Sequence, residues 1–279
     1  MRQDDMIGTA SHPSQRLTVP AALARSWMLR SPLGELDIEA CDALVLDLED
    51  GLPASRKDEG RETAAAFLQH SPAWVRVNAF GTDEWALDLA MAAAAPQLAG
   101  VMLAVTESAA QIDATAERLG ADTPIVALIE SAVGLERCSS IAAHPATFRL
   151  AFGTGDFRRD TGMSDSPLAL SWPRSRLVVA SAAAGIPAPI DGPTPGDRAA
   201  VLAAAQHAAE MGMTGKLVLD TEDVAAVDEG LSPTRQAIDE ARSLLSRTPD
   251  DSADGSYAPA LARAQRVIDR ATAFGLGGR

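Results

Sequence analysis

The segment CDALVLDLEDGLPASRKDEGRETAAAFLQHSPAWVRVN, residues 41–78, contains the pattern that decides the fold. Its two apolar runs, residues 43–49 and 73–78, lack the polar alternation of a half-exposed strand and are typical of strands buried on both faces. An Ala-rich amphipathic stretch between them predicts a helix. The segment therefore predicts one parallel βαβ unit.

The same alternation continues along most of the chain. Helical stretches separate the apolar runs, and several of them open with Ser, Thr or Asp and close at Gly, as capped helices do. We expect eight strands, at residues 25–30, 43–49, 73–78, 99–105, 124–130, 147–153, 187–191 and 214–220. Eight βα units predict an α/β fold, a (β/α)8 TIM barrel with a C-terminal helical extension. A doubly wound open sheet is the alternative.

The chain divides into three predicted parts. Residues 1–24 are a polar arm without the apolar run of a signal peptide or anchor. Residues 25–246 form the barrel. Residues 247–279 comprise a polar linker and a final amphipathic helix, which we expect to pack on the barrel or on a neighbouring subunit.

Composition excludes several classes of protein. Among 279 residues, 38 acidic against 24 basic side chains give a net charge of −14, which disfavours nucleic acid and anionic membranes as partners. No stretch approaches the length of a transmembrane helix. The two cysteines, Cys41 and Cys138, fit a reduced, cytoplasmic protein in which both are small core residues.

Polar residues gather where the predicted strands end. In a parallel barrel all carboxyl ends meet on one face, which is where active sites of this fold lie. The residues concerned are Asp47, Glu49, Asp50, Arg76, Asn78, Glu130, Asp156, Asp191 and Asp220.

This set of side chains favours metal-assisted chemistry. No histidine falls at a strand end, which argues against a Ser-His-Asp hydrolase and an imidazole-rich zinc site. Carboxylates without His or Cys select a hard ion such as Mg²⁺. A chelated α-keto or α-hydroxy acid suits this arrangement, because the ion stabilises a developing enolate.

Four basic residues bear on this chemistry. Arg76 can bind a substrate carboxylate through a bidentate pair, or can be an ordinary ion-pair partner. Lys216 is expected at the start of the eighth strand, on the wrong side for a Schiff-base aldolase. Lys57 and Arg61, one helical turn apart, are interpreted as a solvated helix face.

The acidic residues have structural interpretations as well. Asp47 and Asp50 suit the cap of the following helix. Glu130 suits the N-terminus of a helix, and Asp156 suits a glycine-flanked turn. Only their joint placement at the strand ends favours a catalytic site.

Several motifs resemble those of the HpcH/HpaI aldolase and citrate lyase β-subunit (CitE-like) family of CoA-thioester lyases. The stretch from Cys41 to Arg61 resembles the family's strand-two motif, and VRVN at 75–78 its arginine-bearing strand. ALIESAVGL at 127–135 and LAFGTGDF at 150–157 resemble its metal-ligand motifs. The segments RSRLVVASAAAGIPAPIDG and GMTGK follow in the family's order, and the resemblance extends from Arg25 to Arg242.

The resemblance implies a TIM barrel in a homotrimer or homohexamer. It implies that Glu130 and Asp156 hold Mg²⁺, or Mn²⁺ in its place, and that Arg76, Gly155 and Asp156 contact the substrate. Glu49 or Asp50 would lie near the water molecules on the metal, so that Arg76, Glu49 and Asp50 are the catalytic candidates. The expected ligand is a small organic acid or its CoA thioester.

The chain also departs from the family pattern. WMLRSPLG stands in place of a VPG turn, Ala104-Val105 in place of a Pro-Lys pair, and LDTED in place of an HPxQ segment. Relatives deliver a C-terminal aspartate to a neighbouring site as an acid/base group, whereas DGSYAP offers Tyr257 there. With an unperturbed pKa of about 10, tyrosine is a poor base at neutral pH.

These observations predict a Mg²⁺-dependent carbon–carbon lyase that cleaves a short hydroxy-acid CoA thioester by a retro-aldol or retro-Claisen reaction. One alternative is an aldolase that acts on free keto acids without CoA. Another is a non-catalytic binding or assembly subunit that kept the metal site and lost the base.

Overall fold

The computed structural model describes residues 19–37, 40–120, 122–246 and 257–276. Eight parallel strands lie side by side in chain order, and the eighth pairs with the first through Trp27 and Leu217. This pairing closes the sheet, so the TIM barrel is confirmed and the open sheet is excluded. The strands are β1 (Ser26–Arg30), β2 (Ala43–Asp47), β3 (Ala73–Val77), β4 (Leu98–Leu103), β5 (Ile125–Ile129), β6 (Thr147–Phe152), β7 (Ile190–Asp191) and β8 (Gly215–Val218).

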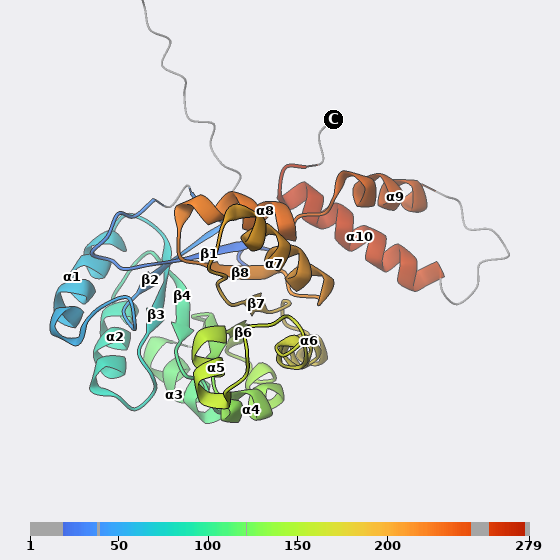
Figure 1. Ribbon diagram of the computed structural model, residues 1–279. Helices are drawn as coiled ribbons and strands as arrows, with labels where there is room; N and C mark the ends of the chain where they lie inside the picture. Colours follow the sequence, from blue (N-terminus) through green and yellow to red (C-terminus); the bar gives the residue numbers. More distant parts are fainter. Residues whose placement is uncertain (1–18, 38–39, 121, 247–256, 277–279) are drawn as a thin grey trace, which may run out of the picture.

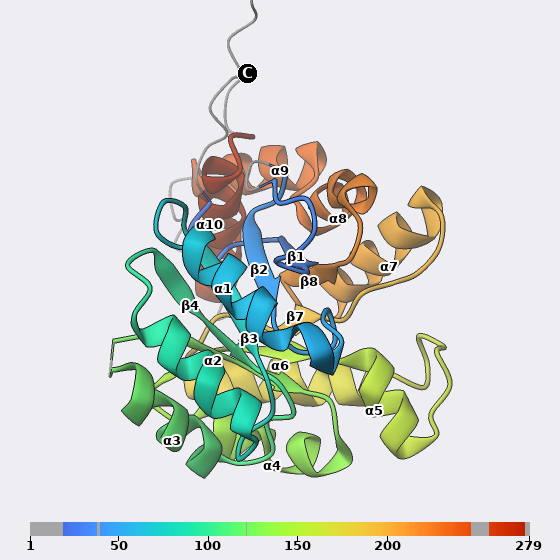
Figure 2. The ribbon, with the colours of Figure 1, turned by 90° about the vertical axis from the view of Figure 1, so that its left-hand side faces the viewer.

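Helices surround the strands on the outside (Figure 1). In Figure 2, α1 and α2 lie in front of β2 and β3 on the side that faces the viewer. The helices are α1 (Lys57–Phe67), α2 (Asp83–Ala93), α3 (Ala109–Leu119), α4 (Ala132–Ala142), α5 (Thr154–Thr161), α6 (Ser171–Ala184), α7 (Arg198–Glu210), α8 (Val224–Leu231), α9 (Arg235–Leu245) and α10 (Tyr257–Ala273).

The apolar residues form two layers, because each buried strand sends alternate side chains to opposite faces. Large side chains such as Trp27, Trp74 and Met102 fill the barrel interior. A second layer, which includes Leu46, Val75 and Ile129, packs against the helices. Both predicted core cysteines, Cys41 and Cys138, are buried and form no disulfide.

A buried arginine closes the amino-terminal end of the barrel. The guanidinium of Arg149 donates to the carbonyl oxygens of Ala21, Ala24 and Ala188 and to the hydroxyl of Thr214. Burial lowers its pKa to about 9. Trp27 Nε1 also donates to the carbonyl of Ala24, and the N–H of Ala24 to that of Ala21. Arg149 joins the segment before β1 to the segments before β7 and β8.

Helices α9 and α10 pack against each other beside α8 and project from one side of the barrel (Figure 1). The guanidinium of Arg270 donates to the carbonyl of Leu231, and Arg25 stacks over the ring of Phe274. The division into arm, barrel and C-terminal extension stays a prediction. Most of the arm and the linker at 247–256 lie outside the described residues.

No helix in the described ranges is long and apolar enough to cross a membrane.

We expect Arg149→Met to lower the free energy of unfolding by about 1–3 kcal/mol, because it removes the donor to the carbonyl of Ala188 and the hydrogen bonds that join three segments at this end of the barrel. Urea denaturation measures the change, and Arg266→Met, at an exposed position on α10, is the control. Equal stability of the two variants would contradict a structural role for Arg149.

Candidate active site

A cavity of about 410 Å³ opens at the carboxyl ends of the strands. It contains five of the six side chains or backbone positions that the sequence predicts for the site, namely Asp50, Arg76, Glu130, Gly155 and Asp156. The sixth, Glu49, lies beside it in contact with Arg76. The rest of the lining is Leu29, Asp47, Gly51, Leu128, Gly153, Thr154, Pro193, Leu217 and Leu219. The roles of these residues remain predictions.

An ion pair joins the ends of β2 and β3. Arg76 donates from Nε and Nη2 to the two carboxylate oxygens of Asp47, at 2.7 and 2.6 Å. Its Nη1 lies 2.8 Å from Oε2 of Glu49. Burial alone would lower the pKa of Arg76, but the hydrogen bonds and charge of Asp47, with Glu49, raise it above its usual value. Arg76 therefore stays charged, and Asp47 fixes its orientation.

Glu49 has an unusual environment for a carboxylate. Burial raises its pKa, and the charges of Asp50 and Asp47 add to the effect while Arg76 opposes it. Its Oε2 is shielded from solvent and faces Nη1 of Arg76 as an ion pair, but within the part of the chain that the structure describes it accepts no hydrogen bond of normal geometry. A buried oxygen of this kind has a lone pair available for a proton or a bound cation.

Glu130 is the carboxylate most affected by its surroundings. Burial raises its pKa to about 8, with further contributions from the charges of Glu49 and Asp156, while a hydrogen bond from the Val105 N–H opposes the shift. Val105 donates to Oε1 at 2.7 Å and has a φ of 49°, which is strained for a β-branched residue. A side chain at Gly153 would begin 2.5 Å from Oε2 of Glu130. Backbone from two loops therefore holds this carboxylate in place.

The contributions of Val105 and Gly153 to the position of Glu130 could not be predicted from residue types. Val105 stands where the family has a Pro-Lys pair, and it acts through its backbone N–H. Gly153 acts through the space that it leaves open. Strain at Val105 and the close approach at Gly153 become visible only when the neighbouring loops are in place.

Asp156 lies in the first turn of α5, where its Oδ1 pairs with Arg159 at 2.6 Å. This position corrects the expectation of a simple turn. The structure also removes the capping interpretations: the N-caps after β2 are Pro53 and Arg56, so neither Asp47 nor Asp50 caps a helix.

Glu130 does not cap a helix either. The cap of α4 is Ser131, whose side chain accepts from the N–H of Gly134, and Glu130 instead bonds to the loop after β4.

The solvated helix face expected at Lys57 and Arg61 is wrong. Lys57 is buried, and its Nζ donates to the carbonyls of Leu48 and Glu49 and to Oδ1 of Asn78, at 2.6, 2.7 and 2.9 Å. The ammonium has this environment because α1 packs directly behind the turn that follows β2. Lys57 therefore fixes the backbone of Leu48 and Glu49.

Arg61 is buried for a related reason. It pairs with Asp58, Glu84 and Asp88, and Asp88 accepts from both the backbone and the side-chain amide of Asn78. Helical spacing predicted that Lys57 and Arg61 share a face, but it could not show that this face meets α2 and β3.

Two carboxylates expected at the site lie elsewhere. Asp191 points away from the barrel interior and is fully buried between Lys216 and Arg174, at 2.9 Å from each. Lys216 lies near the start of β8, as expected, with its ammonium in this ion pair. Asp220 is exposed and caps the short 3-10 helix Thr221–Asp223.

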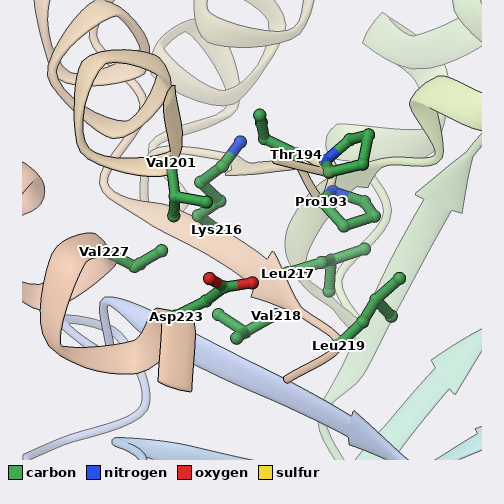
Figure 3. A pocket seen from close by; sticks show the side chains of 10 residues that line it. Pro193, Thr194, Val201, Lys216, Leu217, Val218, Leu219, Asp223 and Val227 are labelled. Carbon is green, nitrogen blue, oxygen red and sulfur yellow. The ribbon is translucent and has the colours of Figure 1, made fainter. Parts of the chain in front are cut away.

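A second cavity of about 330 Å³ adjoins the first behind β8 (Figure 3). The two cavities share Pro193, Leu217 and Leu219. Its wall is mostly apolar, with Asp223 as a carboxylate on one side. This second cavity enlarges the space beside the candidate site, but it contributes no carboxylate to the group around Arg76.

The electrostatic balance of the main cavity favours a cation. Asp47, Glu49, Asp50, Glu130 and Asp156 surround one arginine, and mutual repulsion with burial accounts for the raised pKa values.

The oxygen donors suit Mg²⁺. In the described ranges, no group of three or more His, Cys, Asp and Glu side chains could enclose a metal ion. Glu130 and Asp156 can supply two carboxylates to one cavity, which fits the usual Mg²⁺ site, where water and substrate oxygens complete the coordination.

A closed parallel barrel with carboxylates and an arginine at the carboxyl ends of its strands has the architecture of a TIM-barrel enzyme. The chain belongs to the HpcH/HpaI aldolase/citrate lyase family, whose model matches residues 30–221. The HpcH/HpaI aldolase C-terminal domain matches residues 236–275.

Three similar proteins illustrate the range of this family. The chain is 29% identical over 251 residues to a citrate lyase subunit beta-like protein of Deinococcus radiodurans, covering 82% of this chain and 87% of that protein. It is 28% identical over 209 residues to (3S)-malyl-CoA thioesterase of Cereibacter sphaeroides, covering 72% of each. The crystal structure of CitE from Mycobacterium tuberculosis in complex with magnesium, acetoacetate and coenzyme A matches with a TM-score of 0.75 and 25% identity, covering 90% of this chain and 99% of that one. The family comprises lyases and enzymes that process CoA esters.

We expect Lys57→Met to lower the free energy of unfolding by about 1–3 kcal/mol, since it leaves the buried Oδ1 of Asn78 without its donor and removes the ammonium from the carbonyls of Leu48 and Glu49. The neighbouring Arg56→Met removes only a solvent-exposed pair with Glu59 and should change the stability much less. Urea denaturation of both variants measures the difference, and a Lys57→Met variant as stable as Arg56→Met would restore the solvated-face interpretation.

Replacement of Glu130 should stabilise the metal-free protein at high pH. Because the folded-state pKa of Glu130 lies near 8, above its unfolded value, the folded state binds the extra proton between these values and loses stability as pH rises through them. Glu130→Gln removes this cost while keeping the acceptor for Val105. With a chelator present, we expect the variant to be more stable than wild type by about 1–3 kcal/mol at pH 8.5 and equal to it near pH 4.5. Chemical denaturation at both pH values tests this, and a less stable variant at pH 8.5 would contradict the raised pKa.

Proposed function

We propose that the protein is a Mg²⁺-dependent carbon–carbon lyase that cleaves a short hydroxy-acid CoA thioester by a retro-aldol or retro-Claisen reaction. The supporting observation is the buried Glu130, with its pKa raised to about 8, in one cavity with Asp156 and Arg76. Such a perturbed carboxylate in a cavity at the catalytic face of a barrel is typical of a functional site.

Glu130 and Asp156 are the residues that would hold the ion. When bound, Mg²⁺ would polarise the carbonyl of a chelated substrate and offset the negative charge that develops on its oxygen. The Val105 N–H orients one oxygen of Glu130, leaving the other for the cation. Mn²⁺ has similar ligand preferences and is expected to substitute.

Arg76 would bind and orient the substrate carboxylate. Asp47 occupies the Nε–Nη2 edge of the guanidinium, so a substrate would approach Nη1 and displace the contact with Glu49. Glu49, with its raised pKa, is then placed to exchange a proton with the substrate or with a water molecule. Asp50 and Gly155 complete the wall around the substrate.

Relatives support the substrate class. One is named (3S)-malyl-CoA thioesterase, and another was solved in complex with magnesium, acetoacetate and coenzyme A. A small organic acid or its CoA thioester is therefore the proposed ligand, in a cytoplasmic homotrimer or homohexamer.

Tyr257 favours a second candidate function. It begins α10 and is not among the residues that line the cavity. If no carboxylate reaches the site from the C-terminal extension, the protein would act as an aldolase on free keto acids without CoA, or as a non-catalytic binding or assembly subunit.

Turnover and ligand-induced stabilisation separate these functions. We expect wild type to be stabilised by Mg²⁺ together with pyruvate or oxaloacetate, by about 2.7 kcal/mol at 100 times the dissociation constant. On a panel of short hydroxyacyl-CoA thioesters, Glu130→Gln should lower turnover at least about 1000-fold, equivalent to about 4 kcal/mol.

Glu62→Gln, at an exposed position on α1, is the matched control and should keep full activity. Turnover retained by Glu130→Gln would overturn the metal assignment. Cleavage of free keto acids alone would favour the aldolase, and no turnover with retained binding would favour the non-catalytic subunit.

A further inference from the structure

A second charged cluster lies outside the proposed active site, between the barrel and α6. Asp191 on β7 accepts from Arg174 at 2.9 and 3.3 Å and from Lys216 at 2.9 Å. All three side chains are at least nine-tenths buried, with Asp191 and Lys216 almost inaccessible. Although burial opposes it, the charges of Lys216 and Arg174 lower the pKa of Asp191, which is therefore ionised.

The cluster has two cations for one carboxylate. A surplus buried charge is costly unless a counter-charge or hydrogen bonds compensate it. Lys216 is well compensated, because its Nζ also donates to the carbonyl of Gly192 at 2.6 Å. Arg174 is not: its Nε and Nη2 bond to Asp191, while Nη1 makes no hydrogen bond to any residue of the described ranges.

Arg174 lines a cavity of about 270 Å³ on the outer side of the loop after β7. His207 on α7 forms part of the same wall, and its Nε2 is shielded from solvent without a hydrogen-bond partner in the part of the chain that is described. Asp165 also lines the cavity, but Arg158 at 3.2 Å offsets its charge. The wall therefore contains a cation, Arg174, that lacks a full counter-charge, whereas the Nε2 atom of His207 is shielded from the cavity.

The rest of the wall combines small apolar side chains with the hydroxyl-bearing Thr154 and Thr194. Pro195 and Ala203 contribute to it, and the same loop carries Pro193 and Thr194, which Figure 3 shows beside Lys216 and above Leu217. Pro193 lines this cavity, the apolar cavity behind β8 and the active-site cavity. An occupant would thus contact the loop that closes all three.

We propose that this cavity binds a small monocarboxylate with a short alkyl chain. Its carboxylate would contact Nη1 of Arg174, and its alkyl chain would lie on the proline and alanine side chains. The proline and alanine side chains of the wall offer an alkyl chain contacts that inorganic phosphate, which has no apolar part, cannot make. This site is independent of the proposed lyase function, because Arg174, the charged group that would hold the ligand, does not line the active-site cavity, although the two cavities share Thr154 and Pro193.

Sodium butyrate is the probe, in saturation-transfer NMR titrations of the full chain with a chelator present and ionic strength held constant with sodium chloride. We expect saturable binding to wild type and at least tenfold weaker binding to Arg174→Met. That variant leaves Asp191 and Lys216 as a balanced pair, so the fold should persist. Arg176→Met removes the same charge from the same helix and should bind like wild type.

Ala204→Leu provides a variant that keeps every charge but fills the cavity, and it should abolish binding. If Arg174→Met does not fold, Ala204→Leu alone tests the proposal. Absence of saturable binding to wild type, or equal binding to wild type and Ala204→Leu, would overturn the proposal. Tighter binding of inorganic phosphate with the same dependence on Arg174 would overturn the assignment to a carboxylate.

Discussion

The bidentate pair between Asp47 and Arg76 is the interaction on which the candidate site depends. It joins two neighbouring strands at their carboxyl ends and keeps a buried guanidinium charged and oriented. Without this cation, the carboxylates of Glu49 and Glu130 would face only other carboxylates. Their raised pKa values show that one arginine does not offset the repulsion and burial completely. The site is thus built with unsatisfied negative charge, which a divalent cation and an organic acid can use together.

The surrounding backbone holds this unfavourable arrangement in place. Lys57 directs its ammonium to the carbonyls of Leu48 and Glu49, and the strained Val105 directs its N–H to Glu130. Such strain and buried charge persist only where the surrounding structure stabilises them, and they are common at functional sites. The supporting residues lie on α1 and on the loop after β4, and both elements pack against the closed barrel.

At β7 and β8 the buried charge has the opposite sign. Arg174 and Lys216 share the single carboxylate of Asp191, so this buried cluster has a surplus of positive charge in a protein with a net charge of −14. Negative charge surrounds the interior cavity, while positive charge lies behind β7. The loop that contains Pro193 borders the cavities of both charged regions and therefore connects them.

The sequence by itself determined the number and order of the strands, because buried parallel strands require continuous apolar runs separated by amphipathic helices. It also placed Arg76, Glu130 and Asp156 together, since the carboxyl ends of parallel strands share one face. Only the tertiary structure decided that Asp191 points outward to Arg174, that Lys57 is buried, and that Val105 is a hydrogen-bond donor at the site. Those outcomes depend on which side of a strand faces the barrel and on which helix packs behind a given loop. Such contacts between residues far apart in the chain leave no trace in local periodicity or residue type.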